Sequence, residues 1–191
     1  MPAKLRNLAH SALIAIFLFL GCSGRATDEP SAIPAISFYP MEGSPTKVVL
    51  FVHGLFGDPR ATWTNAAGES WPDLMRWDND FRGYAIATIR YDSPLLWRSS
   101  GIEEVATRVF QQLNDARVFT NYHEIYFISH SMGGLVAKRV LTKLAGQQRN
   151  EHLRKVKAIL YISTPVQGAE SAALGSWISA NPQLSDLRQQ I

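Results

Sequence analysis

The sequence predicts an α/β fold in which a mainly parallel sheet carries helices on both faces. Four short apolar runs are dominated by Val, Ile, Leu, Phe, Tyr or Ala, as expected of strands that are buried on both faces. Helical patterns lie between these runs, and this alternation is typical of β-α units. The predicted strands span residues 47–53, 84–90, 124–129 and 156–162.

Two amphipathic helices connect these strands. A crossover helix is predicted between the second and third strands, where apolar residues recur at steps of three and four. These residues are Ile102, Val105, Ala106, Val109, Phe110, Leu113 and Ala116. A second helix follows the third strand, and Gly146 is predicted to end it in a left-handed conformation.

The stretch between the first and second strands is rich in Trp, Asp and Asn. Ser70-Trp71-Pro72 is predicted to begin a short helix with Ser70 as its N-cap. We expect Trp63, Trp71 and Trp77 to pack this stretch onto the sheet.

The turn after the third strand carries the most distinctive motif, Ser129-His130-Ser131-Met132-Gly133-Gly134. A nucleophile elbow needs small residues two before and two after its serine, because the strand and the helix pass closely there. Gly133 meets this demand, and Ser129 replaces the usual first glycine with a side chain of only one carbon and one oxygen. The motif and its position between a strand and a helix predict that Ser131 is a nucleophile.

Acyl transfer by such a serine also needs N–H donors for the oxyanion that forms. The backbone N–H of Met132 is one candidate, because the residue after the nucleophile lies at the N-terminus of the helix. The loop after the first strand supplies the second candidate, since Gly54 allows a tight turn and Leu55 can present its N–H. We therefore expect two separate segments of the chain to form one oxyanion hole.

Four strings, FVHGLFGDPRATW, IRYDSP, ISHSMGG and YISTPVQGAE, follow one another along the chain. In this order they resemble the α/β-hydrolase superfamily, and within it the lipase-like and serine esterase groups related to GPI-inositol deacylases. The resemblance covers residues 47–169. It implies that Ser131 attacks an ester carbonyl and that the N–H groups of Leu55 and Met132 form the oxyanion hole, with Gly54 and Gly133 as structural supports.

None of the five histidines stands where the fold places the triad base, because the chain order there is Ser, then Asp or Glu, then His. The resemblance implies that His53 shapes the oxyanion loop, and His130 is expected to point away from Ser131. His123 and His152 are expected at the surface, and His10 belongs to a predicted signal peptide.

We therefore expect the acid and the base to lie beyond Ile191, with this chain as an N-terminal portion of the domain, truncated before the last strands. Asp92 is a weaker candidate for the acid, because an Asp followed by Ser-Pro is typical of a turn.

Residues 1–21 are predicted to be a signal peptide, with Lys4 and Arg6 before an apolar run at 12–20 that is short for a bilayer span. Phe19-Leu20-Gly21-Cys22-Ser23 resembles the lipobox of bacterial lipoproteins, which implies lipid attachment at Cys22, the only cysteine. A plain signal peptide or an uncleaved anchor are the alternatives. Residues 22–45 are predicted to be a flexible tether and residues 46–191 the hydrolase domain.

These features predict an exported protein that is anchored by lipid to the bacterial cell envelope, at the outer membrane or the periplasmic face. The formal charge of +3 falls to +1 without the two basic residues of the signal peptide, so nucleic acid is not an expected partner. No P-loop string occurs, and the histidines and carboxylates lack metal-ligand spacing, so we expect neither a cofactor nor a metal.

The predicted function is that of a serine esterase or lipase, which cleaves a small-molecule ester or a lipid through an acyl-enzyme at Ser131. The alternative is a catalytically inactive, truncated hydrolase module that acts as a binding or interaction protein.

Overall fold

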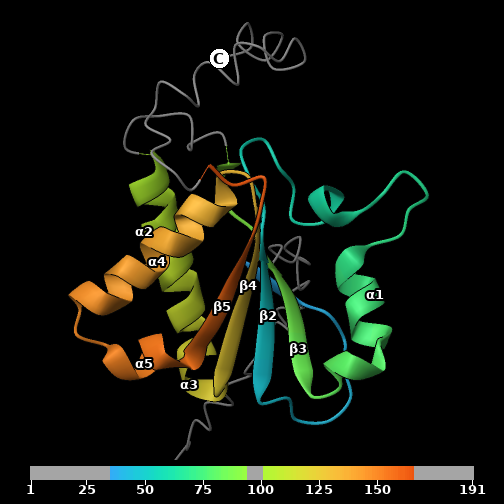
Figure 1. The fold of residues 1–191 in the computed structure, drawn as a ribbon, viewed down its shortest axis with the longest axis horizontal. Helices are drawn as coiled ribbons and strands as arrows, with labels where there is room; N and C mark the ends of the chain where they lie inside the picture. Colours follow the sequence, from blue (N-terminus) through green and yellow to red (C-terminus); the bar gives the residue numbers. More distant parts are fainter. Residues whose placement is uncertain (1–34, 94–100, 166–191) are drawn as a thin grey trace, which may run out of the picture. The chain divides into compact units, whose positions relative to one another are not determined.

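The computed structural model describes residues 35–93 and 101–165, which form a five-stranded sheet with helices on both faces (Figure 1). The strand order is β1-β3-β2-β4-β5, and only β1 runs antiparallel to its neighbour. The strands are β1 (Ile36–Phe38), β2 (Lys47–Val52), β3 (Tyr84–Ile89), β4 (Glu124–His130) and β5 (Val156–Ile162). The predicted mainly parallel α/β sheet is thus confirmed.

Helices α2, α3, α4 and α5 lie on one side of the sheet in Figure 1, and α1 lies on the other. Their bounds are α1 (Trp71–Trp77), α2 (Gly101–Asp115), α3 (Val118–Asn121), α4 (Gly133–Gly146) and α5 (Asn150–Lys155). Two short 3-10 helices, η1 (Ala61–Trp63) and η2 (Asn79–Phe81), flank α1 in the chain.

The alternation of side chains along β2 divides the apolar core between the two faces of the sheet. Val48, Leu50 and Val52 share one face of the strand and pack with α2 and α4. Val49 and Phe51 point the other way and pack with Trp63 of η1 and Met75 of α1. Burial on both faces explains why this strand is a continuous apolar run in the sequence.

Strand β1 lies within the segment 22–45 that was predicted to be a tether. Ile36 pairs with Ile89 of β3, and the N–H of Arg90 donates to the carbonyl of Ala35 at 2.8 Å. The strand has only three residues, of which Ile36 alone is buried, so it left no periodic signal in the sequence.

Three local predictions need correction. Gly146 is the last residue of α4, and the left-handed conformation is taken by Gln148 instead, with φ of 56°. Ser70 is the N-cap of α1, but its side chain makes no capping hydrogen bond. Trp77 is 75% exposed and does not pack on the sheet, whereas Trp63 and Trp71 both pack edge-on against Phe51.

The predicted signal peptide, the lipid attachment at Cys22 and the first part of the tether lie outside the described residues. Within the described ranges, no helix combines the length and the apolar character that a bilayer crossing requires.

Candidate active site

Ser131 occupies the turn between β4 and α4. Its N–H donates to the carbonyl of Ile162 at 2.8 Å, which extends the pairing of β4 with β5, and its own carbonyl accepts from the N–H of Gly134 at 3.2 Å. Its φ of 52° is left-handed, a conformation that residues other than Gly, Asn and Asp rarely adopt. Ser131 therefore sits on a strained strand-to-helix turn of the kind that an elbow requires.

The glycines around Ser131 are where the chain segments touch most closely. A Cβ on Gly133 would lie 2.2 Å from the carbonyl oxygen of His53, and a Cβ on Gly134 would lie 2.3 Å from Oγ1 of Thr164. The start of α4 thus passes directly over the end of β2 and the residues after β5. Ser129 is fully buried in the middle of the sheet, where it pairs with Val52 on one side and Tyr161 on the other.

The loop after β2 meets the elbow through Gly54. A Cβ on Gly54 would lie 2.7 Å from the Cβ of Ser131 and 3.2 Å from its Oγ. The N–H of Gly57 donates to the carbonyl of Gly54 at 3.1 Å and closes a tight turn around Leu55 and Phe56, the latter with φ of 53°. The structure therefore brings together the two segments that carry the predicted oxyanion donors.

The N–H of Met132 lies at the N-terminus of α4, where the first N–H groups of a helix have no partner within that helix. The Met132 side chain is 1% exposed and packs into the core with α2 and α4. Its burial fixes the backbone of this residue next to Ser131.

His53 is fully buried and acts as a support of the loop. Its Nδ1 donates to the carbonyl of Gly54 at 3.0 Å, and its ring stacks on Tyr91 at a centroid distance of 4.1 Å. Burial lowers the pKa of His53, so the ring is held neutral. The placement agrees with the structural role that the resemblance implies for His53.

Tyr91 is a supporting residue that the sequence reasoning missed. Its hydroxyl donates to the carbonyl of His53, the same carbonyl that Gly133 approaches. Burial raises the pKa of this phenol, so it remains a donor at every relevant pH. Its position directly after β3, within IRYDSP, was the available signal, because residues that follow parallel strands meet at one edge of the sheet.

The other described histidines are engaged elsewhere. The ring of His130 is half-buried and lies edge-on to Trp63 at 6.4 Å. His123 is exposed and precedes β4, at the opposite end of that strand from Ser131. His152 was expected at the surface, but it is half-buried on α5 and stacks on Phe119 at 5.6 Å.

Asp92, the weaker candidate for the acid, is exposed after β3. Across the described residues, no three His, Cys, Asp or Glu side chains lie close enough together to hold a metal ion.

The family described as "Putative serine esterase (DUF676)" matches residues 42–178 of the chain. The chain belongs to this serine esterase family. The resemblance to serine esterases of the α/β-hydrolase superfamily is thereby confirmed, and the family assigns the chain to the hydrolases.

Curated relatives include Protein SERAC1 of Bos taurus, 28% identical over 148 residues, and Protein SERAC1 of Homo sapiens, 27% identical over 146 residues. Each alignment covers 65% of this chain and 22% of the relative, so the chain spans about a fifth of the length of these relatives.

Similar solved structures include one of the metagenome-derived lipolytic enzymes LipS and LipT, with a TM-score of 0.41, 16% identity and coverage of 77% of this chain and 51% of that one. Another is the metagenomic α/β hydrolase MGS-MChE2, with a TM-score of 0.39, 18% identity and coverage of 78% and 57%.

Proposed function

We propose that the protein is a serine esterase or lipase that cleaves a carboxylic ester through an acyl-enzyme at Ser131. The observation that carries the proposal is the left-handed turn of Ser131 at the start of α4, in direct contact with Gly54 of the loop after β2. This arrangement supports the attack of a serine on a carbonyl whose oxygen faces two sets of backbone N–H groups.

In the proposed reaction, Oγ of Ser131 bonds to the carbonyl carbon while its proton passes to a general base. The carbonyl oxygen becomes an oxyanion that accepts hydrogen bonds from the N–H groups of Leu55 and Met132. The positive end of the α4 dipole favours this negative charge. The C–O bond to the alcohol then breaks, the alcohol leaves with a proton, and water hydrolyses the acyl-enzyme.

The acid and the base are proposed to follow Ile191 in a longer protein. The four described histidines pack against other residues or precede β4, and the curated relatives are several times longer than this chain. The fold supplies its acid and its base from loops after later strands.

The test is hydrolysis of p-nitrophenyl acetate by the 191-residue chain with and without added imidazole, which can take the place of a missing base. Without imidazole, the chain is expected to hydrolyse the ester poorly. Serine proteases that lack triad members accelerate the reaction only about 10³–10⁴-fold over the rate in water. Imidazole is expected to raise the hydrolysis rate of the wild type above that of Ser131→Ala. The rate of Ser131→Ala also measures hydrolysis by free imidazole, which is subtracted.

Ser129→Ala is the matched control, because Ser129 is a buried serine two residues away. Equal rates for the wild type and Ser131→Ala under all conditions would contradict the proposal. That result would favour the second candidate, an inactive hydrolase module that binds a partner. The rings of His53, His130 and His152 pack against Tyr91, Trp63 and Phe119, and this observation keeps the second candidate in view.

The substrate is proposed to be an ester or a lipid at the bacterial cell envelope, reached from a lipid anchor at Cys22. The lipobox-like string around Cys22 supports this location. Cys22→Ser is expected to move the protein from the membrane fraction to the soluble fraction, and unchanged fractionation would contradict the anchor.

A further inference from the structure

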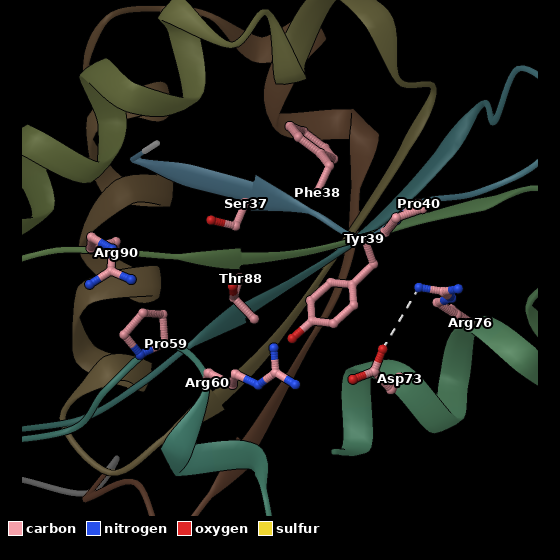
Figure 2. Close-up of a pocket in the computed structure, with 10 residues that line it drawn as sticks. All are labelled: Ser37, Phe38, Tyr39, Pro40, Pro59, Arg60, Asp73, Arg76, Thr88 and Arg90. Atoms are coloured by element: carbon pink, nitrogen blue, oxygen red, sulfur yellow. Dashed lines mark ion pairs between the residues drawn. The ribbon is translucent and has the colours of Figure 1, made fainter. Parts of the chain in front are cut away.

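A cavity of about 400 Å³ lies beside β1 and β3, on the face of the sheet that carries α1 (Figure 2). Three arginines from three different segments line it, and we call it the arginine pocket. Arg60 comes from the loop after β2, Arg76 from α1 and Arg90 from the end of β3. Its volume lies within the range of pockets that bind small molecules.

The charges of the arginine pocket are unbalanced. Among the described residues that line it, Asp73 is the one acid, and it pairs with Arg76 at 3.8 Å. Arg60 and Arg90 form no ion pair with any residue that the structure describes. The Nε of Arg90 is buried and, within the same described part of the chain, has no hydrogen-bond partner. A buried donor of this kind is destabilising unless a water molecule or a ligand satisfies it.

Asp58 lies close enough to Arg90 to feel its charge, and its carboxylate is engaged by the backbone. Its Oδ1 accepts the N–H groups of Arg60 and Ala61, each at 2.8 Å. These two bonds lower the pKa of Asp58, and the charge of Arg90 lowers it further. Asp58 therefore fixes the turn that presents Arg60 to the pocket, and within the described ranges its carboxylate forms no ion pair with Arg60 or Arg90.

Hydroxyl groups line the pocket between the arginines. Ser37 of β1 and Thr88 of β3 are paired in register, and Figure 2 shows both hydroxyls, together with that of Tyr39, among the arginines. Hydroxyl and guanidinium groups both suit a tetrahedral anion with several oxygens, because a hydroxyl can donate one hydrogen bond to it and a guanidinium two parallel ones.

We propose that the arginine pocket binds the phosphoryl group of a phosphate ester. Excess positive charge, a buried guanidinium nitrogen without a partner among the described residues, and three hydroxyl groups in the lining carry the proposal, which does not depend on the esterase activity. Arg60 lies on the same loop as Leu55, so an occupant would also restrain the loop that carries the proposed oxyanion donor.

The test is isothermal titration of the 191-residue protein with inorganic phosphate and with glycerol 3-phosphate at constant ionic strength. Saturable binding is expected, and Arg60→Gln and Arg90→Gln are each expected to weaken it at least about tenfold, as the loss of a charge-assisted bidentate contact implies. Arg154→Gln, which removes an exposed arginine on α5, is the control for charge and should bind as the wild type does.

Arg60 is exposed, so Arg60→Gln decides the proposal even where Arg90→Gln does not fold. Sedimentation with phosphatidylglycerol and phosphatidylcholine vesicles distinguishes the sources of the phosphoryl group. A lipid headgroup is identified if the protein binds phosphatidylglycerol vesicles, glycerol 3-phosphate displaces it from them, and Arg60→Gln abolishes the binding. A soluble ester is identified if the protein binds glycerol 3-phosphate but not the vesicles. No saturable binding of any probe, or equal binding by Arg60→Gln and Arg154→Gln, would overturn the proposal.

Discussion

Ser131 is one of several residues whose strained backbone gathers at one edge of the sheet. Phe56, Ser131 and Ser163 follow β2, β4 and β5, and each has a positive φ between 49° and 53°. Such residues cost about 1–3 kcal/mol each and persist where the surroundings hold them, often at active sites. The carboxyl ends of parallel strands are also where open α/β sheets bind their ligands. Backbone strain and sheet topology thus both indicate that the functional site lies at the carboxyl ends of the parallel strands.

A substitution at Gly133 tests how tightly the elbow is packed. Gly133→Ala is expected to lower the free energy of unfolding by about 1–3 kcal/mol, because its Cβ would overlap the carbonyls of His53 and Val52. Gly146→Ala is the matched control on the same helix, where a Cβ meets no atom within 4 Å, and it is expected to stabilise the protein by about 0.5 kcal/mol. Urea unfolding measures both changes, and equal effects would refute the close contact.

A substitution at Tyr91 tests whether its hydroxyl stabilises the oxyanion loop. Tyr91→Phe removes the hydroxyl that donates to the carbonyl of His53 and is expected to lower the free energy of unfolding by about 1 kcal/mol. Tyr161→Phe, at a tyrosine that is 37% exposed, is expected to change it little. If thermal and urea unfolding give the same stability for the two variants, the hydroxyl has no supporting role.

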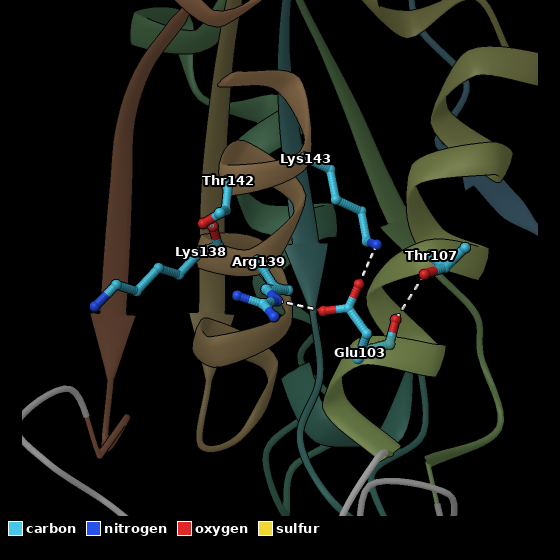
Figure 3. Close-up of polar contacts among 6 residues, drawn as sticks. All are labelled: Glu103, Thr107, Lys138, Arg139, Thr142 and Lys143. Carbon is cyan, nitrogen blue, oxygen red and sulfur yellow. Dashed lines mark hydrogen bonds and ion pairs between the residues drawn. The ribbon is translucent and has the colours of Figure 1, made fainter. Parts of the chain in front are cut away.

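At the scale of elements, α2 and α4 are joined by an ion-pair cluster at their exposed side (Figure 3). The Glu103 carboxylate of α2 accepts from Nε of Arg139 and Nζ of Lys143, which lie one turn apart on α4. Lys143 and Arg139 together lower the pKa of Glu103. Because α4 begins at the elbow, this cluster fixes the helix whose N-terminus follows Ser131.

Glu103→Gln is expected to destabilise the protein more than Glu104→Gln. Within the described part of the chain, the Glu104 carboxylate pairs only with Arg108 on its own helix. Since the pKa of Glu103 is lower in the folded state, its contribution is present above its ordinary value of 4.5 and is lost as the pH falls through the folded-state value. Urea unfolding at neutral and acidic pH should show the difference narrowing toward acid. A difference that is independent of pH would contradict the assignment.

The elements that could be predicted are those with a regular apolar pattern in the sequence. Strands β2, β3 and β4 are apolar runs whose side chains are mostly buried, and the stripe of α2 faces the core as its periodicity required. Strand β5 is also an apolar run, although none of its residues is buried in the described structure. Strand β1 depends on pairing with β3, and no local pattern announces it. The same holds for the arginine pocket, because its three arginines are distant in sequence and meet only in the folded chain.

At the scale of the whole molecule, we expect buried and half-buried histidines to contribute to the response of folding stability to mild acid. Burial lowers the pKa of His53, His130 and His152 from the ordinary value of 6.5. The unfolded chain therefore binds protons first as the pH falls below 6.5, and folding stability decreases until the folded-state values are passed.

His53→Gln is expected to reduce this loss of stability between pH 7 and pH 5, as measured by urea unfolding at each pH. His123→Gln, at an exposed histidine, is the control. Identical pH dependence in the two variants would show that His53 is not held neutral by burial.

The most direct test of Ser131 as the nucleophile is the site of labelling by a fluorophosphonate, which reacts with an activated serine to form a stable phosphonate ester. The full protein is treated with the probe, and the modified peptide is identified by mass spectrometry. We predict labelling at Ser131, its retention in Ser129→Ala and its loss in Ser131→Ala. A correctly folded protein that remains unlabelled at Ser131 would contradict the account.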